Sequence, residues 1–198
     1  MSANAPEQAL SPEEMILVGV QAQLAGRPGV LPAARGLSHF GEHSLGWLGL
    51  AALGAVLQPQ RRREYVTAGA GAFVAHAASV VIKRIVRRKR PDHPYITVGV
   101  GTPSKLSFPS SHATSSTAGA ILLGRASGIP GGALLAPAAV VPPMLTSRMV
   151  LGVHYPTDVA AGAAIGAATA LAAIEGERLW VDRAARRGSK NRTKGSNS

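Results

Sequence analysis

The sequence predicts an all-α protein, a polytopic membrane helical bundle with about five transmembrane helices and an N-terminal interfacial helix. Five stretches contain no Lys, Arg, Asp or Glu, and each is close to the roughly 20 residues that cross a bilayer core. These stretches also lack the charged face that a helix of a soluble protein normally carries. They are rich in Ala and Gly, which let helices approach closely in a membrane. The stretches cover residues 43–60, 65–82, 106–124, 126–147 and 159–174.

The predicted spans divide the chain into three regions. Residues 1–36 are expected to form an N-terminal tail and an interfacial amphipathic helix, in which Ser11 is the N-cap and Pro12 takes the first helical position. The apolar part of this helix is too short to span a bilayer. Residues 37–177 hold the membrane-embedded bundle. Residues 178–198 are basic and polar, which predicts a disordered tail.

The composition limits the class of protein further. The net charge of +11 on 198 residues indicates either a nucleic-acid partner or an anionic membrane surface with anionic substrates. Aromatic residues make up only 4% of the chain, which leaves little for base stacking, so no nucleic acid is expected as a partner. Because the sequence contains no cysteine, disulfides, cysteine-ligated metals and thiolate chemistry are excluded.

Three polar clusters fall at the ends of the predicted spans. They lie far apart in the sequence, but counting the crossings from one span to the next puts all three at the same face of the membrane. The clusters are Lys83 with Arg90, then Ser110, Ser111 and His112, and finally Arg148 with His154 and Asp158. Their meeting at one face predicts a single functional site.

The residue types in these clusters supply what phosphoryl transfer requires. Arg90 and Arg148 can each hold phosphate oxygens with two hydrogen bonds, and Lys83 adds a third positive charge. Ser110 is positioned to cap the helix that follows, so that backbone N–H groups of its first turn, beside Ser111, face the phosphate. The prediction is an anion site made of three cations and a helix N-terminus.

His154, His112 and Asp158 are the candidate catalytic residues. Asp158 follows His154 by four residues, a spacing that lets its carboxylate accept the Nδ1 proton and leaves Nε2 free to attack phosphorus. His112 is expected to protonate the departing alkoxide and afterwards to activate water. This scheme requires no metal ion and no cofactor, and none is expected.

The order and spacing of these residues resembles the signature of the type 2 phosphatidic acid phosphatase superfamily. The matching elements are Lys83, six residues and Arg90-Pro91, then Pro109-Ser110-Ser111-His112, and then Ser147-Arg148, five residues, His154, three residues and Asp158. The resemblance covers roughly residues 37–175. It implies a helical bundle, metal-independent phosphomonoesterase or pyrophosphatase chemistry, and a phosphohistidine at His154. Ser111 departs from the pattern, because the family more often has Gly there.

Residues 100–108 and 151–156 further resemble the actinobacterial branch of this superfamily that acts on decaprenylphosphoryl-5-phosphoribose. The resemblance implies hydrolysis of that lipid to decaprenylphosphoryl-ribose in the synthesis of cell-wall arabinan precursors. Prenyl pyrophosphate, phosphatidate and phosphatidylglycerophosphate are alternative substrates, and lipid phosphotransfer is an alternative activity. A lipid-binding membrane protein without turnover is the non-enzymatic alternative. The expected partners are the bilayer and a membrane lipid phosphate.

The other basic residues and histidines have simpler interpretations. The rest of the basic run between positions 83 and 90 is expected to form a solvated or lipid-facing patch, made of Arg84, Arg87, Arg88 and Lys89. Four further histidines lack the spacing of metal ligands and are interpreted as structural. They are His39, His43, His76 and His93.

Multi-pass insertion in the plasma membrane is expected, with the site on the extracytoplasmic face. Lys and Arg number 11 on the face away from the clusters, and 7 on the face of the clusters once Lys83, Arg90 and Arg148 are set aside as phosphate ligands. Because Lys- and Arg-rich loops favour the cytoplasmic side, this difference mildly favours an external site.

Overall fold

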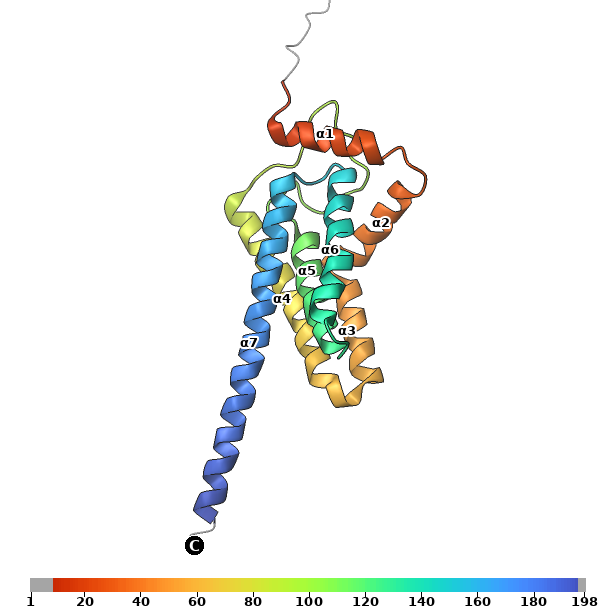
Figure 1. Cartoon of the computed structure of the whole chain (residues 1–198). Helices are drawn as coiled ribbons and strands as arrows, with labels where there is room; N and C mark the ends of the chain where they lie inside the picture. The colour runs from red at the N-terminus through yellow and green to blue at the C-terminus, as the bar shows by residue number, and fades with distance from the viewer. Residues whose placement is uncertain (1–8, 196–198) are drawn as a thin grey trace, which may run out of the picture.

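Helices make up most of the protein. A computed structural model describes residues 9–195, with side chains for residues 9–184 and for residue 186 (Figure 1). No strand forms between residues 9 and 195, where Lys89 and Leu106 make an isolated bridge, so the predicted all-α class is confirmed. In chain order the elements are α1 (Pro12–Leu24), α2 (Val30–Gly41), η1 (Glu42–Ser44), α3 (Leu45–Leu57), η2 (Pro59–Arg61), α4 (Arg62–Val86), α5 (Ser111–Ala126), α6 (Gly132–Val150) and α7 (Pro156–Gly195).

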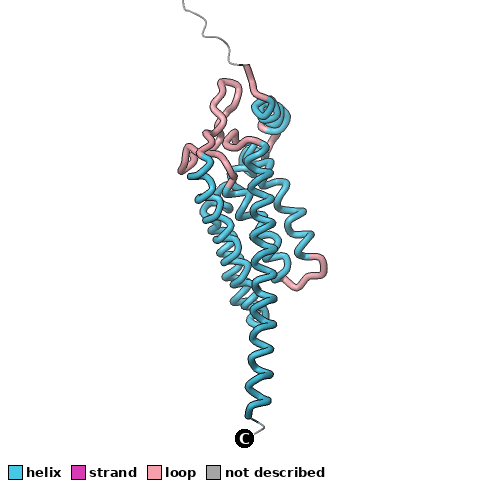
Figure 2. Tube along the Cα trace, turned by 90° about the vertical axis from the view of Figure 1, so that its left-hand side faces the viewer, coloured by secondary structure: helices cyan, strands magenta, loops and turns pink. Residues whose placement is uncertain are grey.

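Helices α3 to α7 form a bundle around α5 (Figure 1). Helix α5 packs against α3, α4, α6 and α7, and every residue from Ala113 to Ala120 is buried. Helix α1 lies across one end of the bundle, and the loop between α4 and α5 lies at that same end (Figure 2). This is the end at which α4 finishes and α5 and α7 begin, so the three polar clusters meet there as predicted.

Two glycines allow α7 to lie close against α5. A Cβ atom on Gly162 would lie 2.7 Å from the carbonyl oxygen of Ser110, and one on Gly166 would lie 2.3 Å from that of Thr114. Since backbone atoms cannot give way as a flexible side chain can, only glycine fits at these positions. Close packing through Gly162 and Gly166 is the role that small residues serve between membrane helices.

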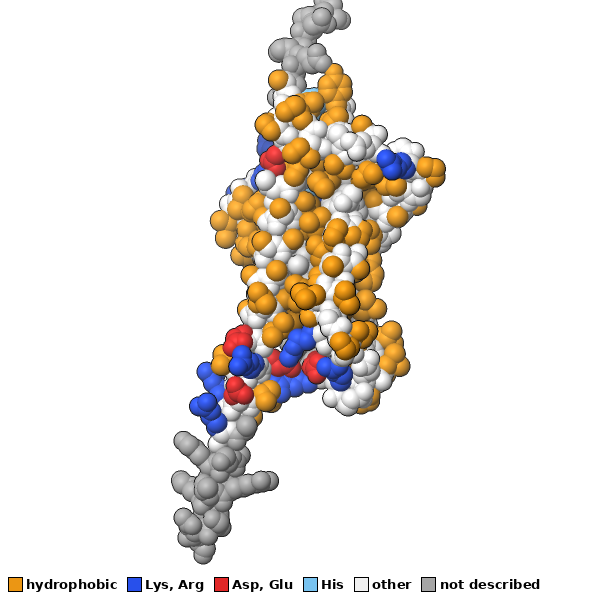
Figure 3. All heavy atoms as spheres, viewed as in Figure 1, with side chains coloured by type: hydrophobic (Ala, Val, Ile, Leu, Met, Phe, Trp, Pro, Cys, Tyr) orange, Lys and Arg blue, Asp and Glu red, His pale blue; other side chains and the backbone are white. Residues whose placement is uncertain are grey.

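The length and composition of the helices fit a membrane protein. Among the described residues, three segments are long and apolar enough to cross a membrane: Pro59–Val86, Gly132–Val150 and Pro156–Ala184. Figure 3 shows hydrophobic side chains over the middle of the bundle, and charged side chains gathered toward the end away from α1. Helices α3 and α5 have 13 and 16 residues, or about 20 and 24 Å, which is less than the bilayer core.

The N-terminal helix starts as predicted. Ser11 is the N-cap of α1, its side chain accepts a hydrogen bond from the backbone of Glu14, and Glu14 returns the contact to form a capping box. Pro12 occupies the first turn. Residues 1–8 of the predicted N-terminal tail lie outside the described residues.

The C-terminal part differs from the prediction of a disordered tail. Helix α7 continues through residue 178 to Gly195, and residues 196–198 lie outside the described residues. The reason is that residues 177–187 are mostly Arg, Ala, Leu and Glu, which favour helix. They extend a helix that has already formed, so no new unfavourable nucleation step is needed.

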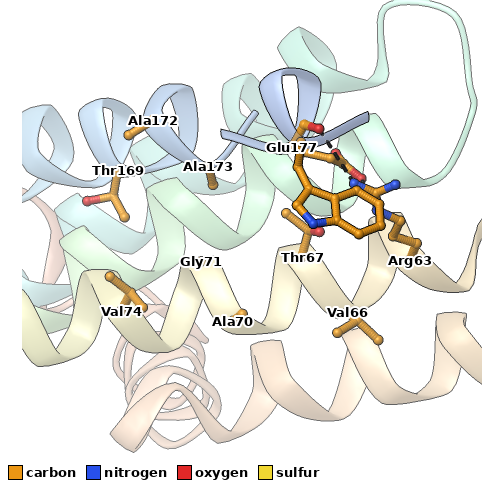
Figure 4. A pocket seen from close by; sticks show the side chains of 11 residues that line it. Arg63, Val66, Thr67, Ala70, Gly71, Val74, Thr169, Ala172, Ala173 and Glu177 are labelled. Carbon is orange, nitrogen blue, oxygen red and sulfur yellow. Dashed lines mark hydrogen bonds and ion pairs between the residues drawn. The ribbon is translucent and has the colours of Figure 1, made fainter. Parts of the chain in front are cut away.

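The side of α7 away from the clusters is attached to α4 and α5 by charged residues. Glu177 forms ion pairs with Arg63 at 3.6 Å and with Arg125 at 2.5 Å. The Arg63 guanidinium lies 4.0 Å from the ring centroid of Trp180. Arg63, Glu177 and Trp180 border a hollow of about 490 Å³ between α4 and α7, in which Arg63 and Glu177 face each other (Figure 4).

Candidate active site

A cavity of about 660 Å³ opens at the α1 end of the bundle. Of the eight residues predicted for the site, six line it: Lys83, Arg90, Ser111, His112, Arg148 and His154. The other two, Ser110 and Asp158, are fully buried next to the lining residues. The structure therefore brings together residues that lie more than seventy positions apart in the chain.

His154 lies in the short turn between α6 and α7, and its side chain is only 2% exposed. Its Nε2 atom is 3.2 Å from Nη1 of Arg90. Because a guanidinium can only donate hydrogen bonds, Nε2 accepts here and carries a lone pair. Burial, followed by the positive charges of Arg90 and Arg148, lowers the pKa of His154 well below its ordinary value of 6.5. The ring is therefore neutral at neutral pH.

Asp158 lies one helical turn after His154, in the first turn of α7. Its Oδ2 atom is 3.7 Å from Nδ1 of His154, too long for a hydrogen bond, and Nδ1 has no other partner among the described residues. Oδ2 accepts a hydrogen bond from the backbone of Tyr155 at 2.8 Å, and Oδ1 accepts one from Arg88 at 3.0 Å. The predicted pair is thus adjacent but not hydrogen-bonded in this state.

His112 lies in the first turn of α5 and lines the cavity. Its Nε2 atom is 2.9 Å from the carbonyl oxygen of Ser38 in α2. A carbonyl can only accept, so Nε2 carries the proton and, in the neutral ring, Nδ1 carries the lone pair. The contact fixes both the orientation and the tautomer of His112.

The three predicted cations differ in their surroundings. Lys83 donates to the carbonyl oxygens of Leu106, Ser107 and Pro109 at 3.2, 3.1 and 2.9 Å. A lysine ammonium has three protons, so these contacts engage all of them. Lys83 therefore anchors the loop before α5 in addition to bringing its charge to the cavity wall.

Arg90 and Arg148 hold their guanidinium groups against the cavity by different contacts. Arg90 donates to the carbonyl oxygens of Ser104 at 2.8 Å and Val153 at 2.6 Å. Burial lowers the pKa of Arg90 to about 10, so the residue keeps its charge at neutral pH. Arg148 is 2% exposed and donates from Nη1 to the Ser38 hydroxyl at 2.7 Å, while its Nε atom has no partner in the described part of the chain. That free donor leaves hydrogen-bonding capacity for a ligand.

The two serines of the second cluster have different positions: Ser110 caps α5 and Ser111 lines the cavity. Ser110 is the N-cap of α5, as predicted, and its hydroxyl accepts a 3.4 Å hydrogen bond from the backbone of Ala113. The Ser110 backbone N–H donates to the Asp158 carbonyl at 3.0 Å, which ties α5 to α7. Ser111 lines the cavity, and its hydroxyl lies 2.7 Å from that of Ser79.

Several residues of the site were not predicted from the sequence. Ser38 contacts both His112 and Arg148, and Arg88, which was assigned to a surface patch, contacts Asp158. Their partners are distant in sequence, so no local spacing could indicate these contacts. The cavity also reaches His43 and His76, interpreted above as structural. Within the described residues, no three His, Cys, Asp or Glu side chains come together as a group that could hold a metal ion.

The bundle and its site define a class of protein: a membrane phosphatase, in which Lys and Arg side chains line a cavity beside two histidines, with a buried carboxylate next to one of them. Comparison with known proteins gives the family. Residues 64–180 match the model of the PAP2 superfamily, which is more than half of the chain, and the protein belongs to that superfamily.

Named relatives and a solved structure agree with this assignment. The chain is 66% identical over 150 residues to the decaprenylphosphoryl-5-phosphoribose phosphatase of Mycolicibacterium smegmatis, covering 76% of this chain and 81% of the relative. It is 62% identical over 161 residues to the protein of that name from Mycobacterium tuberculosis, covering 81% and 88%. In fold it is similar to a transmembrane PAP2-type phosphatidylglycerolphosphate phosphatase from Bacillus subtilis, with a TM-score of 0.67, 18% identity, and coverage of 86% and 88%.

Proposed function

We propose that this protein hydrolyses the 5-phosphate of decaprenylphosphoryl-5-phosphoribose, giving decaprenylphosphoryl-ribose and inorganic phosphate. The observation that carries the substrate assignment is the 62–66% identity to relatives that bear this activity in their name. The cavity supports it, since it offers three cations to a phosphate group and two histidines beside them.

In the first step of the proposed mechanism, His154 attacks phosphorus through Nε2. The lone pair on Nε2 and the lowered pKa of His154 support this role, because the attacking nitrogen must be unprotonated. Arg90, Arg148 and Lys83 stabilise the charge on the phosphate oxygens, together with backbone N–H groups beside Ser111. The P–O bond to the ribose breaks, and His112 protonates the departing alkoxide from Nδ1. Because the Ser38 carbonyl holds the Nε2 proton, this step requires that His112 be doubly protonated when the phosphate is bound.

In the second step, water attacks the phosphohistidine at His154 and releases phosphate. His112, now unprotonated, removes a proton from that water, so the same residue acts first as acid and then as base. Asp158 stabilises the positive charge that the His154 ring acquires once Nε2 bonds to phosphorus. A shortening of the present 3.7 Å separation would accompany that charge.

The membrane topology belongs to the same proposal. We propose five crossings by α3 to α7, in which the short helices α3 and α5 are completed by flanking backbone that packs against protein rather than lipid. Residues 37–177 then form the membrane-embedded unit, and α1 lies at the membrane surface. In this proposal the site faces the outside of the plasma membrane, because Lys and Arg are in excess at the opposite end and favour the cytoplasmic side.

A substrate panel tests the proposed function. The purified protein is given prenylphosphoryl-5-phosphoribose, prenyl pyrophosphate, phosphatidate and phosphatidylglycerophosphate, with and without a chelator, and released phosphate is measured. The expected result is the highest kcat/KM for prenylphosphoryl-5-phosphoribose, unchanged by chelator. A higher kcat/KM for another lipid would overturn the substrate assignment. Loss of lipid phosphate without free phosphate would identify a phosphotransferase, and lipid binding without turnover a binding protein.

A further inference from the structure

Helix α1 faces the bundle through residues spaced four apart. Glu13, Leu17 and Gln21 lie on one stripe of the helix, because positions i, i+4 and i+8 share a face. Leu17 is completely buried, whereas Met15 and Ile16 on the other side are 54% and 52% exposed. One face of α1 therefore packs against the bundle, and the other face is exposed.

Gln21 attaches the C-terminal half of α1 to the segment that leads into the site. Its side chain donates to the carbonyl oxygens of Thr97 at 2.7 Å and Val150 at 3.0 Å, and accepts from the Thr97 backbone at 3.0 Å. Val150 ends α6, four residues before His154. The Gln21 amide also lies 2.9 Å from the position that a Cβ atom on Gly152 would take. Gln21 thus covers the turn that carries the nucleophile.

Glu13 attaches the N-terminal half of α1 to the other end of that turn. Its carboxylate accepts hydrogen bonds from the Thr157 backbone at 3.2 Å and hydroxyl at 2.6 Å, and it pairs with Nη2 of Arg88. The same guanidinium donates from Nη1 to Asp158 at 3.0 Å and lies 4.1 Å from the ring centroid of Tyr155. Arg88 therefore connects the α1 carboxylate to the carboxylate that faces His154.

We propose that α1 is a clamp on the catalytic turn, and that Arg88 is a positioning residue that orients Asp158 toward His154. Arg88 holds Oδ1 of Asp158, which leaves Oδ2 as the oxygen that faces the imidazole. Glu13 fixes the guanidinium from the opposite side, because the planar fork of an arginine directs different N–H groups at the two carboxylates. The proposal rests on the proposed function, because it assigns Asp158 its role in phosphoryl transfer.

Two matched substitutions separate this role from a general effect of charge. Glu13→Gln weakens the bridge to Arg88, whereas Glu14→Gln removes a charge from the same turn and keeps the capping box, in which Gln serves as well as Glu. We expect Glu14→Gln to keep the wild-type kcat. We expect Arg88→Gln to lower kcat by about 10- to 100-fold with little change in KM, and Glu13→Gln to lower kcat by a smaller factor.

A charge exchange then distinguishes positioning of Asp158 from simple attachment of α1. The double variant Glu13→Arg with Arg88→Glu restores an ion pair between the two positions but turns a carboxylate toward Asp158. We expect it to regain the thermal stability that Arg88→Glu loses, while kcat stays low. Arg88→Lys, which keeps the charge near Asp158 but lacks the rigid fork that orients two carboxylates, is expected to retain an intermediate kcat.

The outcomes are read on prenylphosphoryl-5-phosphoribose with purified full-length protein in detergent. A wild-type kcat for Arg88→Gln, or full recovery of kcat in the charge exchange, would overturn the role proposed for Arg88. The proposed function would still stand in that case, provided that the wild-type protein hydrolyses the lipid. If the wild-type protein releases no phosphate from any lipid of the panel, the proposed function fails first, and the role of Arg88 in it fails too.

Discussion

The protonation pattern around His154 is determined by its neighbours rather than by the histidine itself. Arg90 can only donate, so it selects the tautomer in which Nε2 is free, and the second proton site, Nδ1, faces Asp158. His112 has the opposite arrangement, because the Ser38 carbonyl holds its Nε2 proton. The two histidines therefore enter the reaction with different atoms available.

The lowered pKa of His154 predicts an unusual acid limit for the reaction. A nucleophile must be unprotonated, so activity is lost as pH falls through the pKa of the free enzyme's His154. Because burial and the nearby arginines move that pKa well below 6.5, we expect this loss to occur well below pH 6.5. The measurement is kcat/KM against pH, with the substrate's own phosphate titration followed by ³¹P NMR and divided out. An acid limb at 6.5 or higher would contradict the expectation.

The proposed double role of His112 predicts a trapped intermediate. p-Nitrophenyl phosphate has a leaving group that departs without an acid, so His112→Ala should still form the phosphohistidine but hydrolyse it slowly. We expect a burst of nitrophenolate equal to one enzyme equivalent, followed by slow turnover. His154→Ala is the control and should give no burst. A linear time course at the wild-type rate for His112→Ala would exclude the role in hydrolysis.

At the scale of elements, the contact between α5 and α7 holds two residues of the site in place. Ser110 and Asp158 begin these helices and are joined by a backbone hydrogen bond of 3.0 Å. Gly162 and Gly166 continue the contact one and two turns further along α7. The position of Asp158 next to His154 therefore depends on the packing of α5 against α7.

This packing predicts opposite effects for two glycines of α7. Gly166→Ala places a methyl group 2.3 Å from the Thr114 carbonyl, so we expect a lower melting temperature and a loss of about 1–3 kcal/mol. Gly176→Ala is the matched control, because nothing lies within 4 Å of its Cβ position and alanine favours helix by about 1 kcal/mol. Thermal unfolding in detergent measures both. Equal melting temperatures for the two variants would argue against close packing at Gly166.

Much of this arrangement follows from the sequence, and the exceptions have a common cause. Motif spacing predicted six of the residues that line the cavity, and capping rules predicted the starts of α1 and α5. Spacing could not show that three loop carbonyls hold Lys83, or that Ser38 and Arg88 contact the proposed site residues, because those partners come from other elements. The length of α7 was missed for another reason, since the polar composition of its end indicated disorder although its residues favour helix.

At the scale of the whole molecule, the uneven distribution of charge bears on orientation. Charged side chains gather at the end of the bundle away from α1, where Glu177 joins α7 to Arg63 and Arg125 (Figure 3). The other end carries the cavity and its buried cations. A part of the net charge of +11 therefore belongs to the site and another part to the opposite end of the bundle.

The absence of cysteine makes the proposed topology directly testable. Single cysteines at Asp92, Gln60 and Ile129 report on the loop before α5, the turn between α3 and α4, and the loop before α6. With five crossings and an external site, an impermeant maleimide should label Asp92→Cys in intact cells. Gln60→Cys and Ile129→Cys should react only after lysis. Labelling of Asp92→Cys and Gln60→Cys from the same side would contradict a crossing by α4, the helix that lies between these two positions.

The central claim is that His154 carries the phosphoryl group during turnover. The most direct measurement compares phosphate release from prenylphosphoryl-5-phosphoribose by the purified His154→Ala variant and by the wild-type protein. Equal thermal stability of the two proteins is the control for folding. We expect a fall in kcat of at least about 10³-fold, because no other group at the cavity replaces the attacking nitrogen. Phosphate release at the wild-type rate would contradict the proposed mechanism.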